Sequence, residues 1–562
     1  MDYFSRRINQ PMRIAILIKE FENLSNWELR IINEIKNNPR LELSLLIQDG
    51  RVGDQNQNSL KNKIRRFVSS GNFWGKLLFK IQGLVEEKLF KEIKTVDKEK
   101  TITFLQTIDT IKVSPKRKGF LDIFNDSDAD RIAAYKPDII LRHEFNIIRG
   151  PILTRSAKYG IWSFHHADNS INRGGPVGFW EIVLRQEAIG VTLQQLTPEL
   201  DGGLVIDKAF FNIHRSFLKT STLAFEGSVS LLFKNIEKLL RGEYSPTKSM
   251  VYSNPLYRAP NVRYTLNYMW QFYGYSFLKL KNLALYKFLG TREDCWTLFI
   301  GKGNFLDATL FRLKPVKLPK DEFWADPFLF EYENQDYVFF ENYSYTTKRG
   351  KISCGKIEKG QVVNVELVLD LDYHLSYPFI FKEAGEIYLM PETEENKRLE
   401  IYRCIDFPTK WELVTTAFEG EMVVDAHFYD DENNKKWLFL NKKVDKATVP
   451  ENELFIYQVD SIRLNRLIPH SQNPILIDAR TARNGGAIFR YGNAVYRPSQ
   501  RNIDARYGKA LNINKIKKLT IDDYVEEHVM TVEPNFHKGL DLMHHLHQTE
   551  NGFVIDAAYK RK

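Results

Sequence analysis

Residues 137–166, PDIILRHEFNIIRGPILTRSAKYGIWSFHH, decide the fold expected for the first half of the chain. The apolar runs at 137–145 and 159–166 have the composition of buried strands, and the second ends on two histidines. Two more strands are expected upstream at 13–18 (RIAILI) and 41–48 (LELSLLIQ), with an amphipathic helix at 25–37 between them. This alternation of strands and helices predicts an α/β domain with a parallel sheet and helices on both faces.

The composition is that of an ordinary globular protein of several domains. The chain has 562 residues, 43% of them hydrophobic and 27% charged, which predicts two to four domains. Its formal charge of +9 is mild for this length, so we expect no nucleic-acid partner. The three cysteines, the absence of a signal peptide and the absence of a long apolar run favour the cytoplasm.

The second half repeats itself. Each copy has a small or polar opening, an apolar strand, a turn and a second strand that ends on a polar residue. The copies are 324–341, 376–392, 424–442, 484–500 and, in degenerate form, 539–560. Five copies at the spacing of a four-stranded blade predict an all-β five-bladed propeller over 291–562. An irregular sandwich with accidental similarity is the alternative.

Two further segments connect or interrupt these domains. Residues 59–94 carry nine Lys or Arg against three Glu, together with an apolar face that Gly71 and Gly83 would interrupt. Such a basic amphipathic insertion either lies on an anionic membrane or packs on its host domain; we favour packing. Residues 246–290 are aromatic and aliphatic, and we expect them to form a helical linker that packs between the domains.

An ordered set of motifs follows the quoted stretch. His165 is followed by Arg173-Gly174 and Pro176, then by Gly190-Val191-Thr192, and then by Leu200-Asp201-Gly202-Gly203. In this order the motifs resemble the folate-dependent formyltransferases, which act on methionyl-tRNA, glycinamide ribonucleotide or nucleotide sugars. The weaker match extends over 12–245 and implies a Rossmann-like domain with 10-formyltetrahydrofolate as its cofactor.

Formyl transfer to an amine needs a base and an oxyanion donor. An imidazole such as His165 titrates near neutrality, and a carboxylate such as Asp201 beside it would orient the ring. Ser163 stands where the family has an asparagine, and its single short hydroxyl is a weaker donor. Ser163 acts through a water, a neighbour (His166 or Asn169) replaces it, or the acyl donor is not formyl-folate.

The resemblance also implies binding residues. Leu200, Gly202, Gly203 and Glu144 would contact the cofactor, and His166, Asn169 and Arg173 would contact the substrate. No metal is expected.

The blade openings resemble the five-bladed propellers of glycoside hydrolases and a region of plant glucosamine inositolphosphorylceramide transferases. The motifs that carry this resemblance are Ala325-Asp326-Pro327 followed by Phe340-Glu341, and Ser376-Tyr377-Pro378 followed by Met390-Pro391-Glu392. Asp326, Asp425 and Arg497 would meet at the central channel. There they bind a saccharide, cap the strands, or cleave a glycoside.

These observations together predict a transferase that moves a formyl-like acyl group to a nucleotide-linked or lipid-linked amino sugar in surface glycan synthesis. The propeller would recognise the saccharide. The alternatives are a carbohydrate-binding scaffold without catalysis, and glycoside hydrolysis or glycosyl transfer in the propeller. The enzyme would be cytoplasmic or peripheral to the inner membrane face, with membrane contact through 59–94, and an oligomer is compatible with the sequence.

Overall fold

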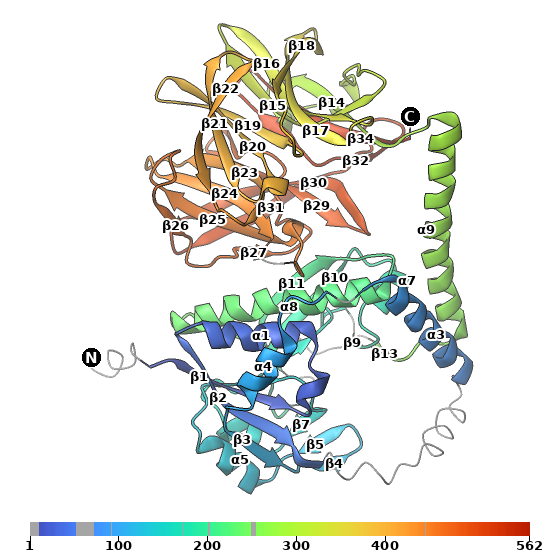
Figure 1. Ribbon diagram of the computed structural model, residues 1–562, viewed down its shortest axis with the longest axis vertical. Coiled ribbons are helices and arrows are strands. Elements are labelled where there is room, and N and C mark those ends of the chain that lie inside the picture. Colours follow the sequence, from blue (N-terminus) through green and yellow to red (C-terminus); the bar gives the residue numbers. More distant parts are fainter. Residues whose placement is uncertain are drawn as a thin grey trace. The chain divides into compact units, whose positions relative to one another are not determined.

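The chain forms two compact units, seen in a computed structural model (Figure 1). The structure describes residues 10–51, 72–91, 93–171, 173–199, 203–248, 255–443 and 446–561. Unit 1 comprises Met1–Ala209 and His214–Phe272, and unit 2 comprises Phe210–Ile213 and Tyr273–Lys562.

Unit 1 is built on an eight-stranded sheet with the order β12-β11-β10-β8-β6-β1-β2-β3. Its strands are β1 (Met12–Ile18), β2 (Leu41–Asp49), β3 (Thr110–Val113), β6 (Ile139–Arg142), β8 (Ile161–His165), β10 (Ala188–Gln195), β11 (Leu204–Asn212) and β12 (Thr247–Lys248). The five strands from β3 to β8 are parallel, as predicted, whereas β10 runs antiparallel to β8. The sheet is therefore mixed. Because β10 is antiparallel to β8, the segment that joins them needs no crossover, and β10 begins at the end of the sheet where β8 finishes.

Helices cover both faces of this sheet. They are α1 (Asn26–Asn37), α3 (Phe73–Leu89), α4 (Lys98–Leu105), α5 (Asp126–Ala133), α6 (Ile152–Arg155), α7 (Phe179–Val183) and α8 (Phe217–Leu240). The Glu28 carboxylate accepts the Ser25 amide at 2.9 Å, which caps the start of α1. Ala15 and Leu17 of β1 pack in one apolar cluster with residues of α5 and α6. On the other face, α1 and α8 contact each other.

The smaller elements of unit 1 border its main sheet. A three-stranded sheet contains β4 (Lys116–Lys118), β5 (Leu121–Ile123) and β7 (Ile147–Arg149), and a two-stranded one contains β9 (Arg173–Gly174) and β13 (Leu256–Tyr257). Short 3-10 helices are η1 (Phe21–Asn23) in unit 1 and η3 (Phe305–Asp307), η4 (Leu310–Arg312), η5 (Glu394–Asn396) and η6 (Pro450–Asn452) in unit 2.

A buried carboxylate fixes α3 to the rest of unit 1. Glu86 is fully buried, and its Oε2 accepts hydrogen bonds from the Ser216 hydroxyl at 2.5 Å and the Leu218 amide at 3.2 Å. Its Oε1 accepts from Gln82 Nε2 at 3.0 Å and from the Tyr268 hydroxyl. Ser216 caps α8, so the carboxylate lies at the positive end of that helix.

This anchoring supports the packed alternative for the described part of the basic insertion. Residues 59–71, including Gly71, lie outside the described residues. The helix α3 runs through Gly83 without interruption, so the expected break there is wrong.

The described residues of unit 2 form five antiparallel sheets, and each quoted repeat supplies the hairpin of one sheet. The first four sheets are β15 (Glu322–Tyr332) to β18 (Gln361–Leu369), β19 (Ser376–Glu383) to β22 (Lys410–Ala417), β23 (Met422–Asp430) to β27 (Leu476–Ile477), and β28 (Phe489–Tyr491) to β31 (Tyr524–Val532). The other strands of these four sheets are β16 (Gln335–Ser344), β17 (Arg349–Glu358), β20 (Glu386–Glu392), β21 (Leu399–Asp406), β24 (Lys436–Lys443), β25 (Glu453–Val459), β26 (Leu467–Pro469), β29 (Ala494–Ile503) and β30 (Arg506–Leu519).

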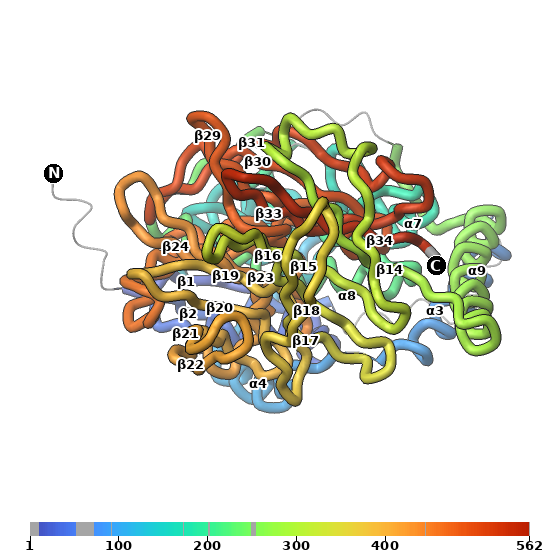
Figure 2. The backbone as a smooth tube through the Cα atoms, turned by 90° about the horizontal axis from the view of Figure 1, so that it is seen from above, coloured from blue at the N-terminus to red at the C-terminus, as the bar shows by residue number. Residues whose placement is uncertain are grey.

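The fifth sheet joins strands from the two ends of unit 2. In it β14 (Glu293–Lys302) pairs with β34 (Gly552–Arg561), which also pairs with β32 (Leu540–Leu542) and β33 (Leu546–Gln548). The two strands lie side by side in Figure 2.

Hydrogen bonds and ring contacts pass from each sheet to the next, and from the fifth sheet back to the first. They are Phe328 to Tyr377, Tyr377 to His427, Gln500 to Asp425, Leu546 to Gly485, and Asp326 to Asp556.

Three of the sheets open with the same backbone distortion. Asp326, Tyr377 and Asp425 have φ values of 49°, 44° and 49°, in the left-handed region that such residues rarely adopt. At each of them the first strand slips in register against its partner, which is the geometry of a β-bulge. The repeated opening motif in the sequence therefore encodes a repeated bulge that re-aims one residue per sheet.

Helix α9 (Val262–Leu289) fulfils the prediction of helix in 246–290. Residues 249–254 of that segment lie outside the described residues. The buried side chains of α9 are Thr265, Tyr268 and Phe272, all in unit 1, and the helix is exposed beyond them. That exposure differs from the close packing expected along the whole linker.

Candidate functional site

A cavity of about 350 Å³ lies in unit 1, at the edge where β6 and β8 end. Arg142, the last residue of β6, and His165, the last residue of β8, both line it. The other lining residues are Ile147, Ile148, Arg149, Asn169, Arg173, Gly174, Gln194, Leu196, Thr197, Glu199, Gly203 and Leu256. Ligands bind at the carboxyl ends of strands in open α/β sheets, so this is the expected place for a site.

The cavity wall is rich in cations. Arg142, Arg149 and Arg173 face it together with one acidic residue, Glu199. Burial lowers the pKa of the Arg142 guanidinium, but an arginine so far above neutrality stays charged. Its Nη1 donates to the carbonyl of Asn146 at 3.3 Å, and its buried Nε has no hydrogen-bond partner. A guanidinium held in this way favours an anionic or carbonyl oxygen in the cavity.

The Gly190-Val191-Thr192 motif holds the loop that follows His165. Thr192 pairs with His165 across β10 and β8, and its hydroxyl donates to the Ala167 carbonyl at 3.1 Å. A Cβ on Gly190 would lie 2.7 Å from the backbone nitrogen of Asp168, so only glycine permits this approach. The Asp168 carboxylate also pairs with Lys208 at 2.6 Å, which holds the pKa of that carboxyl below its usual value although burial opposes the shift.

Ser163 lies beneath the cavity and does not line it. It is 1% exposed, and its hydroxyl donates to the carbonyl of Phe164 at 3.4 Å. In register it stands between Arg142 of β6 and Gln194 of β10, both of which line the cavity. Neither of these two donors is predicted from the sequence, in which Arg142 stands out only as a charged residue at the end of an apolar strand.

Of the other residues predicted in unit 1, some line the cavity and one does not. Asn169, Arg173 and Gly203 line the cavity with His165. His166 is turned into the core, where its Nε2 lies 3.0 Å from the Ser228 hydroxyl and its ring contacts Trp27 and Phe225. Burial lowers the pKa of His166 to about 3, and this position does not support the predicted substrate contact.

Glu144 and the Leu-Asp-Gly loop, residues 200–202, are the remaining predicted residues of unit 1. The Glu144 carboxylate accepts the Lys19 amide at 2.6 Å and is absent from the cavity wall. Leu200, Asp201 and Gly202 lie outside the described residues, so the predicted pairing of Asp201 with His165 stays a prediction.

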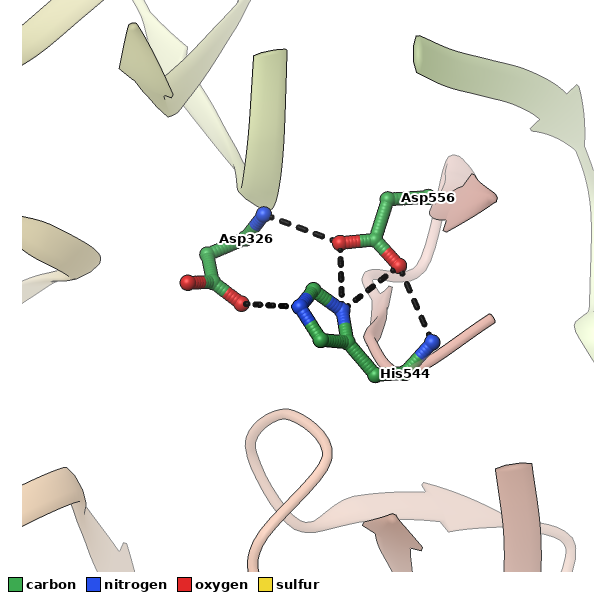
Figure 3. Close-up of side chains that lie close together, drawn as sticks. All are labelled: Asp326, His544 and Asp556. Atoms are coloured by element: carbon green, nitrogen blue, oxygen red, sulfur yellow. Dashed lines mark hydrogen bonds and ion pairs between the residues drawn. The ribbon is translucent and has the colours of Figure 1, made fainter. Parts of the chain in front are cut away.

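Unit 2 holds a second polar cluster at the openings of its sheets (Figure 3). His544 Nδ1 lies 2.8 Å from Asp556 Oδ2, and its Nε2 lies 3.9 Å from Asp326 Oδ1. Asp556 Oδ2 also accepts the Asp326 amide at 3.0 Å. His545 Nδ1 is 3.4 Å from Asp326 Oδ1.

Opposite charges in this cluster shift the pKa values of His544 and Asp326. The carboxylates of Asp556 and Asp326 raise the pKa of His544 against the effect of burial, and the histidines hold the pKa of Asp326 at about 2 although burial opposes the shift. Ligand atoms of Asp326, His544 and Asp556 lie within 4.8 Å of one another, so the three could also hold a cation.

Two buried glutamates and an arginine extend the cluster. Burial, with nearby carboxylates, raises the pKa of Glu341 and of Glu392 well above the usual value, which favours the protonated form of both. Arg483 donates through Nε to Asp425 Oδ2 at 2.5 Å and lies 3.8 Å from Glu392. Asp425 is thus ion-paired and not a free carboxylate. Glu341 and Glu392 end two of the quoted repeats and Arg483 directly precedes the fourth, but none of the three is predicted as a site residue from the sequence.

Arg497 is fully buried in the fourth sheet. It donates to both carboxylate oxygens of Glu526, at 2.7 and 2.8 Å, and to the Thr481 carbonyl at 2.8 Å. These bonds give Arg497 a structural role and do not support the predicted saccharide contact.

Comparisons with known proteins match both parts of the chain to regions of proteins that are named as transferases. Residues 272–549 match the family described as glucosamine inositolphosphorylceramide transferase 1, N-terminal. The protein of that name from Arabidopsis thaliana is 36% identical over 276 residues, which cover 43% of this chain and 35% of the relative. The chain therefore spans about a third of the length of this curated relative. Methionyl-tRNA formyltransferase from Bacillus subtilis (strain 168) is 28% identical over 124 residues, covering 22% of this chain and 39% of that protein.

Solved structures of similar proteins include a sugar N-formyltransferase from Shewanella sp FDAARGOS_354. It is 11% identical, covers 46% of this chain and 87% of its own, and has a TM-score of 0.28. A thermostable family-43 glycoside hydrolase is also 11% identical, covers 42% of this chain and 89% of its own, and has a TM-score of 0.29. At these scores the likeness carries no argument.

Proposed function

We propose that the chain is a transferase in which the unit 1 cavity moves a formyl-like acyl group to the amine of an amino sugar. The observation that carries this proposal is His165 on the wall of a cation-lined cavity at the carboxyl ends of β6 and β8. The sequence likeness to methionyl-tRNA formyltransferase supports the same assignment. The arginines suit a substrate that bears phosphate or carboxylate, such as a nucleotide-linked or lipid-linked sugar.

His165 is the proposed base. The amine nitrogen of the acceptor attacks the acyl carbon, a new C–N bond forms, and the surplus ammonium proton passes to the imidazole. The bond between the acyl carbon and the donor's nitrogen then breaks, and the same proton moves to that leaving nitrogen. Thr192 and Gly190 keep the loop after His165 in place for both transfers.

Arg142 and Gln194 are the proposed oxyanion donors in place of the missing asparagine. They flank Ser163 in register and reach the cavity, whereas the Ser163 side chain does not. Asn169 and His166 are the two neighbours of Ser163 that the sequence suggested as replacements. Asn169 lines the cavity and remains a third proposed donor, whereas His166 does not line the cavity. A charged donor in a site of low dielectric stabilises developing negative charge more strongly than a hydroxyl.

The cavity wall fits 10-formyltetrahydrofolate as the acyl donor. Its volume is that of a small-molecule site, and the unpartnered Nε of Arg142 can donate to a carbonyl or carboxylate oxygen. Arg142, Arg149 and Gly203 would hold this group, which supplies the formyl carbon when bound.

Unit 2 is proposed to be a five-bladed propeller that recognises the saccharide. The repeated bulge, the contacts from each sheet to the next and the pairing of β14 with β34 support this architecture. The relative from Arabidopsis thaliana that has a similar region is named glucosamine inositolphosphorylceramide transferase 1, and the sugar in this name supports a glycan-related role. We place the enzyme in the cytoplasm as part of this proposal.

Calorimetry with a stable 10-formyltetrahydrofolate analogue tests the unit 1 proposal. The full chain should bind the analogue, Arg142→Met should weaken binding at least tenfold, and Arg185→Met, at an exposed arginine, should not. His165→Ala should bind but lose turnover with amino-sugar acceptors. Absence of binding by both the wild type and Ser163→Asn would refute the proposal.

Glycoside cleavage in unit 2 is the second candidate. Asp326, with its pKa lowered to about 2, and Glu392, with its pKa raised, have the divided protonation states of a base and an acid. Release of reducing sugar that is lost in both Asp326→Asn and Glu392→Gln would support it. Release unaffected by either variant would exclude this pair.

A further inference from the structure

The second half of α9 exposes large apolar side chains to solvent. Between Tyr273 and Leu289 no residue is buried, and the exposed fraction of the side chain is 67% for Phe277, 66% for Leu280 and 79% for Phe288. Figure 1 shows α9 as one continuous helix. A globular protein rarely leaves so many large apolar groups on one helix in water, and exposed apolar patches of this kind mark interaction sites.

These side chains form a stripe along the helix. Tyr273, Phe277, Leu280, Ala284 and Phe288 are three or four residues apart and therefore lie on one face. Leu278, Leu283 and Leu289, all exposed, widen the apolar surface beyond that face. The helix is too broadly apolar for a solvent-facing one.

The charges of α9 select the kind of partner. Its charged residues are Arg263, Lys279, Lys281 and Lys287, and it contains no Asp or Glu. Two copies packed along this surface would bring like charges together without a compensating acid. An anionic surface would instead attract the lysines, whose long stems let the ammonium groups stay at the polar boundary while the aromatic rings enter the apolar layer.

We propose that the 273–289 half of α9 lies in the plane of an anionic lipid bilayer, with Phe277, Leu280 and Phe288 inserted and the three lysines at the headgroups. Among the described residues no helix is long and apolar enough to cross a membrane, so the contact is peripheral. This surface is distinct from 59–94, the segment for which the sequence suggested membrane contact. It is independent of the chemistry proposed for either unit.

Flotation of the full chain with vesicles tests the proposal. The wild type should float with vesicles of phosphatidylcholine and phosphatidylserine, and much less with phosphatidylcholine alone or at high salt. Each lysine near an anionic surface contributes about fivefold in partition, so K279E/K281E/K287E should lower the partition coefficient at least a hundredfold. F277S/L280S/F288S should also abolish flotation.

A matched charge reversal serves as the control. K348E/K359E/K397E changes the net charge equally at three exposed turn positions of unit 2 and should float like the wild type. Circular dichroism checks that each variant is folded. Failure of the wild type to float, or flotation unchanged in both α9 variants, overturns the proposal. A wild-type dimer that F277S/L280S/F288S converts to monomers, without flotation, would identify a second copy as the occupant instead.

Discussion

Replacing Glu86 by glutamine should loosen α3 and the start of α8 in unit 1. The Glu86 carboxylate accepts hydrogen bonds from four donors: Gln82, Ser216, Leu218 and Tyr268. Glutamine keeps one acceptor oxygen and turns an NH₂ group toward donors. At least one buried donor is then left without a partner, and the negative charge at the start of α8 is lost.

The expected cost is about 3 kcal/mol. Hydrogen bonds to a charged group contribute roughly 1.5–3 kcal/mol each, and an orphaned buried donor costs about 1–3 kcal/mol, while the retained acceptor offsets part of the loss. With a urea dependence of about 2–3 kcal/mol per molar, the unfolding midpoint of unit 1 should fall by roughly 1 M. Hydrogen exchange of α3 and α8 during urea unfolding reports this unit separately from unit 2.

The neighbouring Glu87 supplies the control, because it is exposed on the same helix. Glu87→Gln should change stability by less than about 0.5 kcal/mol. Equal midpoints for Glu86→Gln and Glu87→Gln would show that the buried hydrogen bonds do not anchor α3, and the reasoning would fail.

Two other perturbations test the packing around the sites. Thr192→Val keeps the side-chain shape but leaves the Ala167 carbonyl without its hydrogen-bond donor. It should therefore destabilise unit 1 by about 1–3 kcal/mol, and it should reduce turnover more than binding of the folate analogue. A variant as active and as stable as the wild type would contradict this. The pKa of His544 is raised above 6.5 in the folded chain, so its contribution to the stability of unit 2 is fully present below about pH 6.5 and is lost as the pH rises through the folded value. Unfolding free energies measured from about pH 6 to 9 should fall for the wild type and change less for His544→Gln, and equal slopes would refute the assignment.

The periodic and repeated parts of the fold could be predicted from the sequence. Apolar runs at 13–18 and 159–166 became β1 and β8, since a strand that is buried on both faces of a sheet reads as a near-continuous apolar run. Each of the five quoted repeats became a hairpin in its own sheet. The reversed direction of β10 could not be predicted, because strand direction depends on the path of the connecting segment and not on composition.

The site was predicted in part, for a similar reason. His165 could be found from motif order, and Arg173 and Asn169 with it. Arg142 and Gln194 could not, because they reach the cavity through their register beside Ser163, and register is set by pairing over long sequence distances. His166 shows the converse: it follows the last residue of β8 and its side chain turns toward Ser228 in the core, so only one of the two neighbouring histidines lines the cavity.

The pairing of β14 with β34 has a consequence for how the protein is made. The two strands are joined in one sheet although more than two hundred residues separate them in the chain. During synthesis β14 leaves the ribosome early and waits, with one apolar face and an unpaired edge, until β34 follows. Such a late, long-range closure slows folding, and in the interval the first strand of unit 2 is exposed to pairing with other chains. The nascent chain thus needs protection at this edge for as long as translation of the intervening residues takes.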